Sequence, residues 1–549
     1  MPAKKSNLLF PALATGVVVA SGVAAYVYLR GGFYDGASPL ASAKIVPDEA
    51  IMASFISTDA QAWSQLQKFG TKEAQDLVMK SLQDANKQAL AKSNIDYEKD
   101  VQPWVGGVMV AVLPPNQVKS TQATPESFDM LMVVKIKDKI SALNFANKLK
   151  ARKDVKTQET DYKGLKITQS SQGQSEPTYS TVINNDYVIV APAKQSVEKA
   201  IDTFKGEPSF ASKQGASNLL SKGIDLKNSL AQVYLPDYGS VVEQLIKNNP
   251  NASQLPPEAL AQLKQVKALA AGIGVDDAGL RMKAVADVEA QLLKNQYQTS
   301  SGKLVDVFPA ETIALISGVG ISKSWNAFSQ QAKNIPQVSL GLDLARVQLQ
   351  NYNLDLDKDI FGWMDGEFAF GAISSDRGLL APVGFGGALI IDTSDRPTAE
   401  ATLNKLDGIA KTAYIGVTPR NVAGKTVTEW QIPAQGALLG HGWLDQDTVF
   451  IAFGGPISDA IALKPTQLLN STNTFKSVTG SFPKPNSGYF YLDMEKTLAL
   501  VNAKGQAAFI PPETKAILDS IRGIGMSASS PNDSTSQLEM LLALKPNQK

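Results

Sequence analysis

One twelve-residue pattern occurs twice in this chain of 549 residues, and it constrains the fold more than any other feature. The first copy covers residues 96–107 and the second covers residues 355–366, an offset of 259 positions. In each copy, acidic residues at alternate positions lead to a tryptophan, Trp104 or Trp363, and then to a glycine. Such a long spacing predicts two related domains, because the repeats of a solenoid are only about 20–50 residues long.

Other matched features occur in the same order in both halves. Pro47 is followed by Trp63 after sixteen positions, and Pro309 is followed by Trp325 after the same interval. Asp59 suits the N-cap of a helix whose buried face would carry Trp63. Further matches are Asn147-Lys148-Leu149 with Asn404-Lys405-Leu406, and Tyr234-Leu235 with Tyr491-Leu492. These matches predict domains at 45–300 and 301–549, joined through the polar stretch 296–303.

In both halves, single helical patterns alternate with groups of consecutive strand patterns. This arrangement predicts the α+β class, with antiparallel or mixed sheets covered by helices, after an N-terminal transmembrane helix. We assign a structural role to the repeated residues Pro47, Trp63, Asp96, Asp100, Trp104, Gly107, Pro309, Trp325, Asp355, Asp359, Trp363 and Gly366.

The segment from Leu8 to Leu29 is almost wholly apolar. As a helix it would be roughly 33 Å long, enough to cross a bilayer core of about 30 Å. Lys4 and Lys5 precede it, which predicts that residues 1–7 are cytoplasmic and that the rest lies beyond the membrane. Residues 30–44 read as a tether. The alternative is a cleaved leader, because residues 41–43 (Ala-Ser-Ala) are similar to a signal-peptide cleavage site.

Composition excludes several kinds of chemistry. The chain has no cysteine, which removes disulfides, thiolate metal sites and cysteine nucleophiles. It has one histidine, His441, so no site can use two imidazole ligands. The net charge is +1 and the charges are dispersed, which argues against nucleic-acid binding. We expect no cofactor.

The Pro-x-Glu opening, the Asp-x-x-x-Trp-x-x-Gly motif and the single N-terminal span resemble a mainly cyanobacterial family of exported proteins, catalogued only as a domain of unknown function. The resemblance covers nearly the whole chain after the predicted anchor. It assigns no activity and therefore no functional residues. It implies that the far side of the membrane is the periplasm or the thylakoid lumen.

The acidic triplet Asp355, Asp357 and Asp359 has the spacing of a calcium loop. An EF-hand needs glycine at the sixth position and glutamate at the twelfth, and this chain has Ile360 and Gly366 there. The interpretation we favour is structural and assigns no metal site. It predicts that Asp96 and Asp355 cap short helices and that the following tryptophans are buried.

Three further features have both a structural and a functional interpretation. His441 is expected at the surface or in a turn, since no nucleophile elbow accompanies it. Ser196 and Lys199 have the spacing of a Ser/Lys hydrolase, yet the partner motifs are missing and the helix is expected at the surface. The apolar stretch 433–443 is either a contact loop or a strand of the core, and we favour the strand.

We therefore expect a membrane-anchored binding or scaffolding protein, with protein partners outside the cytoplasm and lipid contact through Leu8 to Leu29. One alternative is an extracytoplasmic hydrolase that uses Asp/Glu or Ser/Lys. Another alternative is a lipid or pigment carrier.

Overall fold

The computed structural model describes residues 38–90, 95–114, 129–152, 155–172, 176–213, 215–216, 219–220, 224–239, 241–242, 263–333 and 335–547. These residues form two compact units. Unit 1 holds the described residues up to Glu289 together with those from Lys545 onward, and unit 2 holds Ala290–Leu544. The predicted transmembrane segment, Leu8 to Leu29, lies outside the described residues. Among the helices that the structure describes, none has the length and hydropathy needed to span a bilayer.

Unit 1 begins with a helix and then alternates helices with groups of strands. Its elements are α2 (Pro39–Ala43), β1 (Met52–Ile56), α3 (Ala60–Leu66), α4 (Lys72–Leu90), the π-helix η1 (Tyr97–Val101), β2 (Val105–Leu113), β3 (Asp129–Ile136), α5 (Lys139–Lys150), β4 (Val155–Tyr162), β5 (Leu165–Gln172), β6 (Thr178–Ile183), β7 (Tyr187–Ala191), α6 (Lys194–Phe204), η3 (Phe210–Ser212), β8 (Ser229–Leu235), β9 (Val266–Val275) and β10 (Gly279–Val288).

Unit 2 has a closely similar order of elements. They are α10 (Ala290–Gln296), η5 (Lys303–Val307), β11 (Thr312–Val319), α11 (Ile321–Ala332), α12 (Pro336–Gln350), the π-helix η6 (Leu356–Ile360), β12 (Glu367–Ser374), β13 (Phe385–Asp392), α13 (Arg396–Thr412), β14 (Gly416–Val422), β15 (Lys425–Ile432), β16 (Gly436–Trp443), β17 (Thr448–Phe453), α14 (Gly455–Ala462), η7 (Leu469–Ser471), α15 (Asn473–Thr479), β18 (Tyr489–Asp493), α16 (Met494–Ala503), η8 (Gln506–Phe509), α17 (Pro512–Asp519), β19 (Ile521–Asn532) and β20 (Thr535–Leu544).

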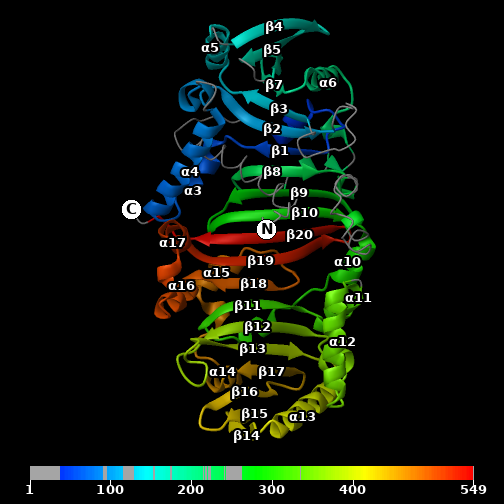
Figure 1. The fold of residues 1–549 in the computed structure, drawn as a ribbon, viewed down its shortest axis with the longest axis vertical. Helices are drawn as coiled ribbons and strands as arrows, with labels where there is room; N and C mark the ends of the chain where they lie inside the picture. Colours follow the sequence, from blue (N-terminus) through cyan, green and yellow to red (C-terminus); the bar gives the residue numbers. More distant parts are fainter. Residues whose placement is uncertain are drawn as a thin grey trace, which may run out of the picture. The chain divides into compact units, whose positions relative to one another are not determined.

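The described strands of each unit form one continuous antiparallel sheet (Figure 1). In unit 1 the order is β4-β5-β6-β7-β3-β2-β1-β8-β9-β10. In unit 2 it is β14-β15-β16-β17-β13-β12-β11-β18-β19-β20. Strand for strand, these two orders are the same. The predicted α+β class is confirmed, and the sheets are antiparallel rather than mixed.

Each sheet buries one face, which we call the inner face, in a main core. In unit 1 the inner side chains include Phe55, Met109 and Leu131, and they pack with Val197 and Ile201 of α6. The unit 2 core is built in the same way from β-strand residues and from α14 and α15. Alternate residues of the same strands point to the opposite face, which we call the outer face.

The end of the predicted tether belongs to unit 1. Residues Pro39–Ala43 form helix α2, which Ser38 caps by accepting a hydrogen bond from the backbone N–H of Ala41. Ser42 and Ala43 are fully buried, and Ala43 is part of the main core. The prediction of a tether to residue 44 is therefore wrong from residue 39 onward, because a short Ser-Pro start nucleates a helix that apolar side chains then bury.

Candidate functional site

The repeated acidic motif has the same geometry in both units. The backbone N–H of Asp96 donates to Asp100 Oδ2 at 2.9 Å, and that of Asp355 donates to Asp359 Oδ2 at 3.0 Å. Each motif folds as a π-helical turn. The indole N–H of Trp104 donates to the carbonyl oxygen of Asp100, and that of Trp363 donates to Asp359 in the same way.

The matched lysines bind the matched aspartates. Lys148 of α5 pairs with Asp100 at 2.6 Å, and Lys405 of α13 pairs with Asp359 at 3.1 Å. Burial opposes the ionisation of Asp100, but the hydrogen bonds from the Lys148 ammonium and the Asp96 backbone N–H, together with the nearby positive charge, lower the pKa of that carboxyl. The hydrogen bond from the Asp355 N–H, aided by Lys405, lowers the pKa of Asp359. The predicted buried tryptophans are confirmed for both motifs.

Each carboxylate of the calcium-like triplet has a protein partner. Asp355 caps η6 by accepting from the backbone N–H groups of Asp357 and Lys358, both at 2.9 Å. Asp357 binds Arg346, and Asp359 binds Lys405. In the part of the chain that the structure describes, no cluster of three or more acidic or histidine residues could hold a metal ion.

The glycine of the motif is required by a close backbone approach. A Cβ atom on Gly366 would lie 2.5 Å from the carbonyl oxygen of Asp392. In unit 1 the equivalent close approach is at Gly106, where a Cβ atom would lie 2.9 Å from the carbonyl oxygen of Lys135. The steric counterpart of Gly366 is thus Gly106, one position before the Gly107 that the sequence pattern pairs with it.

An open apolar groove adjoins the motif of unit 2. It has a volume of about 270 Å³, and we call it the aromatic groove. Its lining residues come from α11, from the segment after η6 and from β12: Ile321, Ser324, Trp325, Phe328, Phe361 and Phe368. Trp325 and Phe361 stack with their ring centroids 4.0 Å apart, and the Phe328 side chain is 47% exposed.

An ionic network fixes the tryptophan of the groove. The Trp325 indole N–H donates to Asp357 Oδ1 at 2.8 Å. Arg346 of α12 binds the same carboxylate through Nε at 3.0 Å, and its other nitrogens reach Ser329 and Asp343. The Arg346 guanidinium holds the pKa of Asp357 below its usual range. Since this carboxylate stays ionised, the indole is held in one orientation across ordinary pH.

His441 is buried in strand β16, so the prediction of a surface or turn histidine is wrong. Its Nε2 lies 2.9 Å from Asp407 Oδ1, and the Trp430 indole N–H donates to the same oxygen at 2.6 Å. Asp407 belongs to α13. The histidine and the tryptophan therefore attach this helix to the sheet. The stretch 433–443 contains all of β16, which lies between β15 and β17, as the favoured strand interpretation predicted.

Ser196 and Lys199 of α6 bind different carboxylates. Ser196 is buried and donates to Asp129, whereas Lys199 pairs with Glu49. The prediction that this helix lies at the surface is wrong for its Ser196 face, which packs on the inner side of the sheet. The two side chains thus give no nucleophile and base in mutual contact, as a Ser/Lys hydrolase requires.

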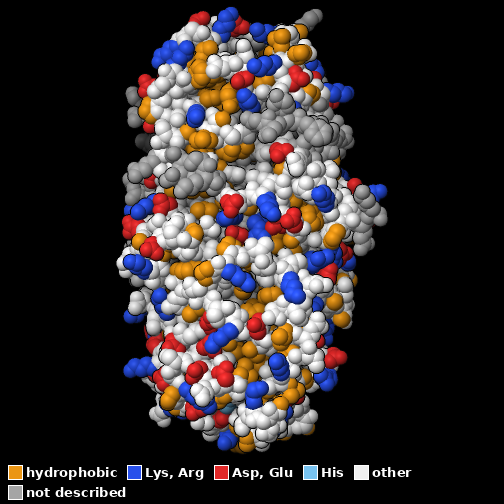
Figure 2. Space-filling model, turned by 180° about the vertical axis from the view of Figure 1, so that it is seen from behind, with side chains coloured by type: hydrophobic (Ala, Val, Ile, Leu, Met, Phe, Trp, Pro, Cys, Tyr) orange, Lys and Arg blue, Asp and Glu red, His pale blue; other side chains and the backbone are white. Residues whose placement is uncertain are grey.

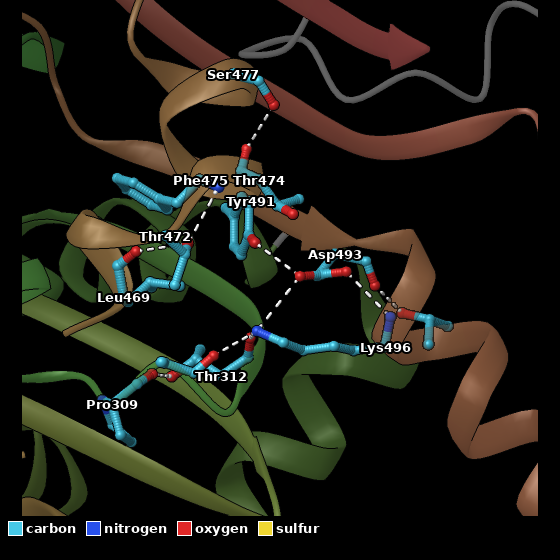
Figure 3. Close-up of polar contacts among 12 residues, drawn as sticks. Pro309, Thr312, Leu469, Thr472, Thr474, Phe475, Ser477, Tyr491, Asp493 and Lys496 are labelled. Carbon is cyan, nitrogen blue, oxygen red and sulfur yellow. Dashed lines mark hydrogen bonds and ion pairs between the residues drawn. The ribbon is translucent and has the colours of Figure 1, made fainter. Parts of the chain in front are cut away.

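A buried charged cluster at the start of β11 was not predicted (Figure 3). Asp493 lies at the end of β18, where it accepts from the Tyr491 hydroxyl at 3.2 Å and pairs with Lys496 at 3.3 Å. The Lys496 ammonium also donates to the carbonyl oxygens of Thr312, at 3.1 Å, and Ala310. In unit 1 the carbonyl oxygen of Ala50, which corresponds to that of Thr312, accepts a hydrogen bond from the Lys213 ammonium. The cluster joins α16 to β11 and has a structural role.

The two prolines occupy matching positions. Pro47 forms an isolated bridge with Ser209, and Pro309 forms one with Leu468. Asp59 caps α3 as predicted, and Trp63 is buried. The groove itself was not predicted. A usable signal was Phe361, which stands where the first motif has Gln102, since the exchange of a buried polar residue for a large aromatic one indicates different packing beside the motif.

Comparisons with known proteins give a family and weak structural likenesses. A family model described as "Protein of unknown function (DUF3352)" matches residues 12–544. No curated protein matches the sequence. The solved structure described as crystal form I of TP0453 has 11% sequence identity and a TM-score of 0.26, covering 46% of this chain and 79% of that one. Crystal form III has 10% identity and a TM-score of 0.24, covering 46% and 80%.

Proposed function

This chain belongs to the DUF3352 family, and we propose that it is a membrane-anchored binding protein whose aromatic groove receives an apolar side chain of a protein partner outside the cytoplasm. The observation that carries the proposal is the open groove lined by Trp325, Phe328, Phe361 and Phe368. Large aromatic side chains at an exposed concave surface are the usual energetic centres of protein interfaces.

The size of the groove favours a side chain over a whole small molecule. Its volume of about 270 Å³ is at the lower limit of ligand pockets, which hold about 300–1,000 Å³. The network of Trp325, Asp357 and Arg346 fixes the groove before any partner arrives. Such preorganisation reduces the entropy that is lost on binding.

The membrane anchor is part of the proposal. The apolar run Leu8 to Leu29 supports it. Cleavage after Ala43 would remove α2, including the fully buried Ser42 and Ala43, from unit 1. This favours an uncleaved anchor over a leader peptide. The periplasm or the thylakoid lumen, and a cyanobacterial source, stay predictions.

We also infer that the two units arose by duplication of one domain. The identical strand orders support this inference, as do the matched Asp–Lys and Trp–carbonyl contacts. The aromatic groove belongs to unit 2, in which Phe361 and Phe328 stand where unit 1 has Gln102 and Leu66.

A photo-crosslinking amino acid placed on α11 tests the binding site. We would introduce it at Ser324, which lines the groove, and separately at Asn326, about 200° further round the same helix. In membranes that carry the full chain, position 324 should crosslink to one protein and position 326 should not. Phe328→Asp should abolish the crosslink from position 324.

Equal crosslinking from both positions would contradict the proposal. Crosslinking of position 324 to lipid alone would instead support the carrier alternative, because an acyl chain would then occupy the groove. Anchoring has its own measurement: the full chain should stay in the membrane fraction after a high-salt wash, and deletion of residues 8–29 should release it.

A further inference from the structure

We propose that the outer face of the unit 2 sheet forms a homodimer, in which a ridge of side chains on one copy lies in a trough on the other. The aromatic groove adjoins this face through Phe368 of β12, but neither the ridge nor the trough contains a residue that lines the groove, and the proposal does not depend on it. Figure 2 shows that hydrophobic side chains gather in patches between charged ones at the molecular surface.

The ridge is one row of directly paired residues that crosses seven strands. Every member is large and apolar: Ile451, Leu389, Phe370, Ile316, Phe490, Met526 and Met540. The middle of the row is open to solvent, with Phe370 43% and Ile316 47% exposed. Leu389 and Ile451 at one end pack partly against the cluster around Trp363. The ridge side chains that another copy could contact therefore lie mainly on the strands from β12 to β20.

The trough is the neighbouring row on the same face. Its members are Phe453, Gly387, Ala372, Ala314, Leu492, Ile524 and Leu542. At its centre are Gly387, Ala372 and Ala314, the smallest side chains that a sheet can offer. A Cβ atom on Gly387 would lie in van der Waals contact with the rings of Phe370 and Phe453, at 3.5 Å and 3.7 Å. These two rings therefore flank the trough at Gly387, and the small side chains of Ala372 and Ala314 continue its floor.

The two rows are complementary to themselves. Consider a two-fold axis that lies in the plane of the interface, between the rows and parallel to them. It places the ridge of each copy over the trough of the other, which is the requirement for an isologous interface. The two sheets would then pack face to face at the usual spacing of about 10 Å.

Charge and area also favour a second copy. Neither row contains a charged residue, so a two-fold axis brings no like charges together. From β13 to β20 the rows span roughly 24 Å, and three outer residues along each strand cover about 20 Å. The two copies would bury on the order of 1,000 Å², the low end for specific interfaces. We therefore expect a transient dimer that membrane confinement promotes.

The described strands of unit 1 form no such trough, although they pair in the same way. Met52, Val112 and Met130 occupy the positions of Ala314, Ala372 and Gly387. Their side chains are long or branched, whereas those at the matching positions of unit 2 are the smallest available. Unit 1 therefore provides a matched control surface, and Met130, which is 55% exposed, is a suitable position on it.

Energy transfer between labelled copies tests the dimer. The chain lacks cysteine, so Ser534→Cys in the β19–β20 turn gives a single labelling site. Donor-labelled and acceptor-labelled full chains are mixed in lipid vesicles, and transfer is followed as lipid dilutes the protein. Phe370→Asp should weaken association at least tenfold, and Met130→Asp in unit 1 should leave it unchanged.

Ala372→Phe is the sharper variant, because it adds apolar surface while filling the trough. It should weaken association at least tenfold, with unchanged hydrogen exchange in β12 as the folding control. Equal or stronger association of this variant would overturn the proposal, as would transfer in the parent chain that stays at the random-collision level at every dilution.

Discussion

Trp63 of unit 1 and Trp325 of unit 2 follow their prolines at the same interval, yet they do different things. Trp63 is only 2% exposed and packs with Ile56, Leu230 and Val275 on the outer face of its sheet. Trp325 instead stacks on Phe361, binds Asp357 and lines an open groove. One framework position therefore serves as core in one unit and as surface in the other.

The difference extends to the helices that cover the outer faces. Helix α5 of unit 1 buries no residue, whereas its counterpart α13 buries several, among them Leu403 and Asp407. Contacts that set the fold recur in both units, as the Asp–Lys pairs show. Exposed positions differ between the units, and a binding function can be placed at such positions without loss of the fold.

The largest expected difference in stability is between substitutions of the two tryptophans. Trp63→Ala should lower the free energy of unfolding of unit 1 by about 3–5 kcal/mol, because it removes a fully buried ring. Trp325→Ala should cost unit 2 about 1–2 kcal/mol, since that ring is partly exposed and loses one hydrogen bond. Hydrogen exchange of the full chain, resolved by peptide, measures each unit separately. Equal losses would mean that the groove is as well packed as the unit 1 core.

The next effect tests the attachment of α13. His441→Ala removes one of the two contacts to the buried Asp407 and should cost about 1–3 kcal/mol. The rate of amide hydrogen exchange in α13 should then approach the rate in α5, which buries no residue. His441→Gln, which keeps a side-chain donor, is the control and should restore part of the protection. Unchanged hydrogen exchange in α13 would show that the Trp430 contact alone is sufficient to hold this helix on the sheet.

A smaller effect concerns the two Asp–Lys pairs. Asp100→Asn should cost about 1–2 kcal/mol, and Asp359→Asn should cost less than about 1 kcal/mol, because the Asp359 side chain is more exposed. Both carboxyls have lowered pKa values in the folded state. Their stabilisation is therefore complete above the ordinary aspartate pKa of about 3.9 and is lost as pH falls through the folded value. In acid, the free energy of unfolding should depend less on pH for each Asn variant than for the parent chain. An equal pH dependence would refute the role of the pairs.

Much of the framework could be predicted from the sequence. Framework contacts depend on residue types that recur at fixed spacing, such as Asp, Trp and Gly in the motif, so the α+β class and the buried Trp104 and Trp363 followed from pattern alone. The aromatic groove could not be predicted, because Trp325 and Phe361 meet only through tertiary packing. His441 was misplaced for the same reason: its partner Asp407 is 34 residues away on a helix, and nothing local indicates that distance.

The smallest expected effect concerns an apolar stripe on α12. Leu340, Leu344 and Val347 recur at helical spacing and are exposed, whereas Leu342 and Leu349 on the opposite side are partly buried. Leu340→Gln with Leu344→Gln should change the stability of unit 2 by less than about 0.5 kcal/mol, and Leu342→Gln should cost more. Since α12 also carries Arg346, a loss of groove binding in the exposed double variant, at unchanged stability, would extend the partner's contact surface from the groove along this helix. Unchanged crosslinking from position 324 would confine that surface to the groove.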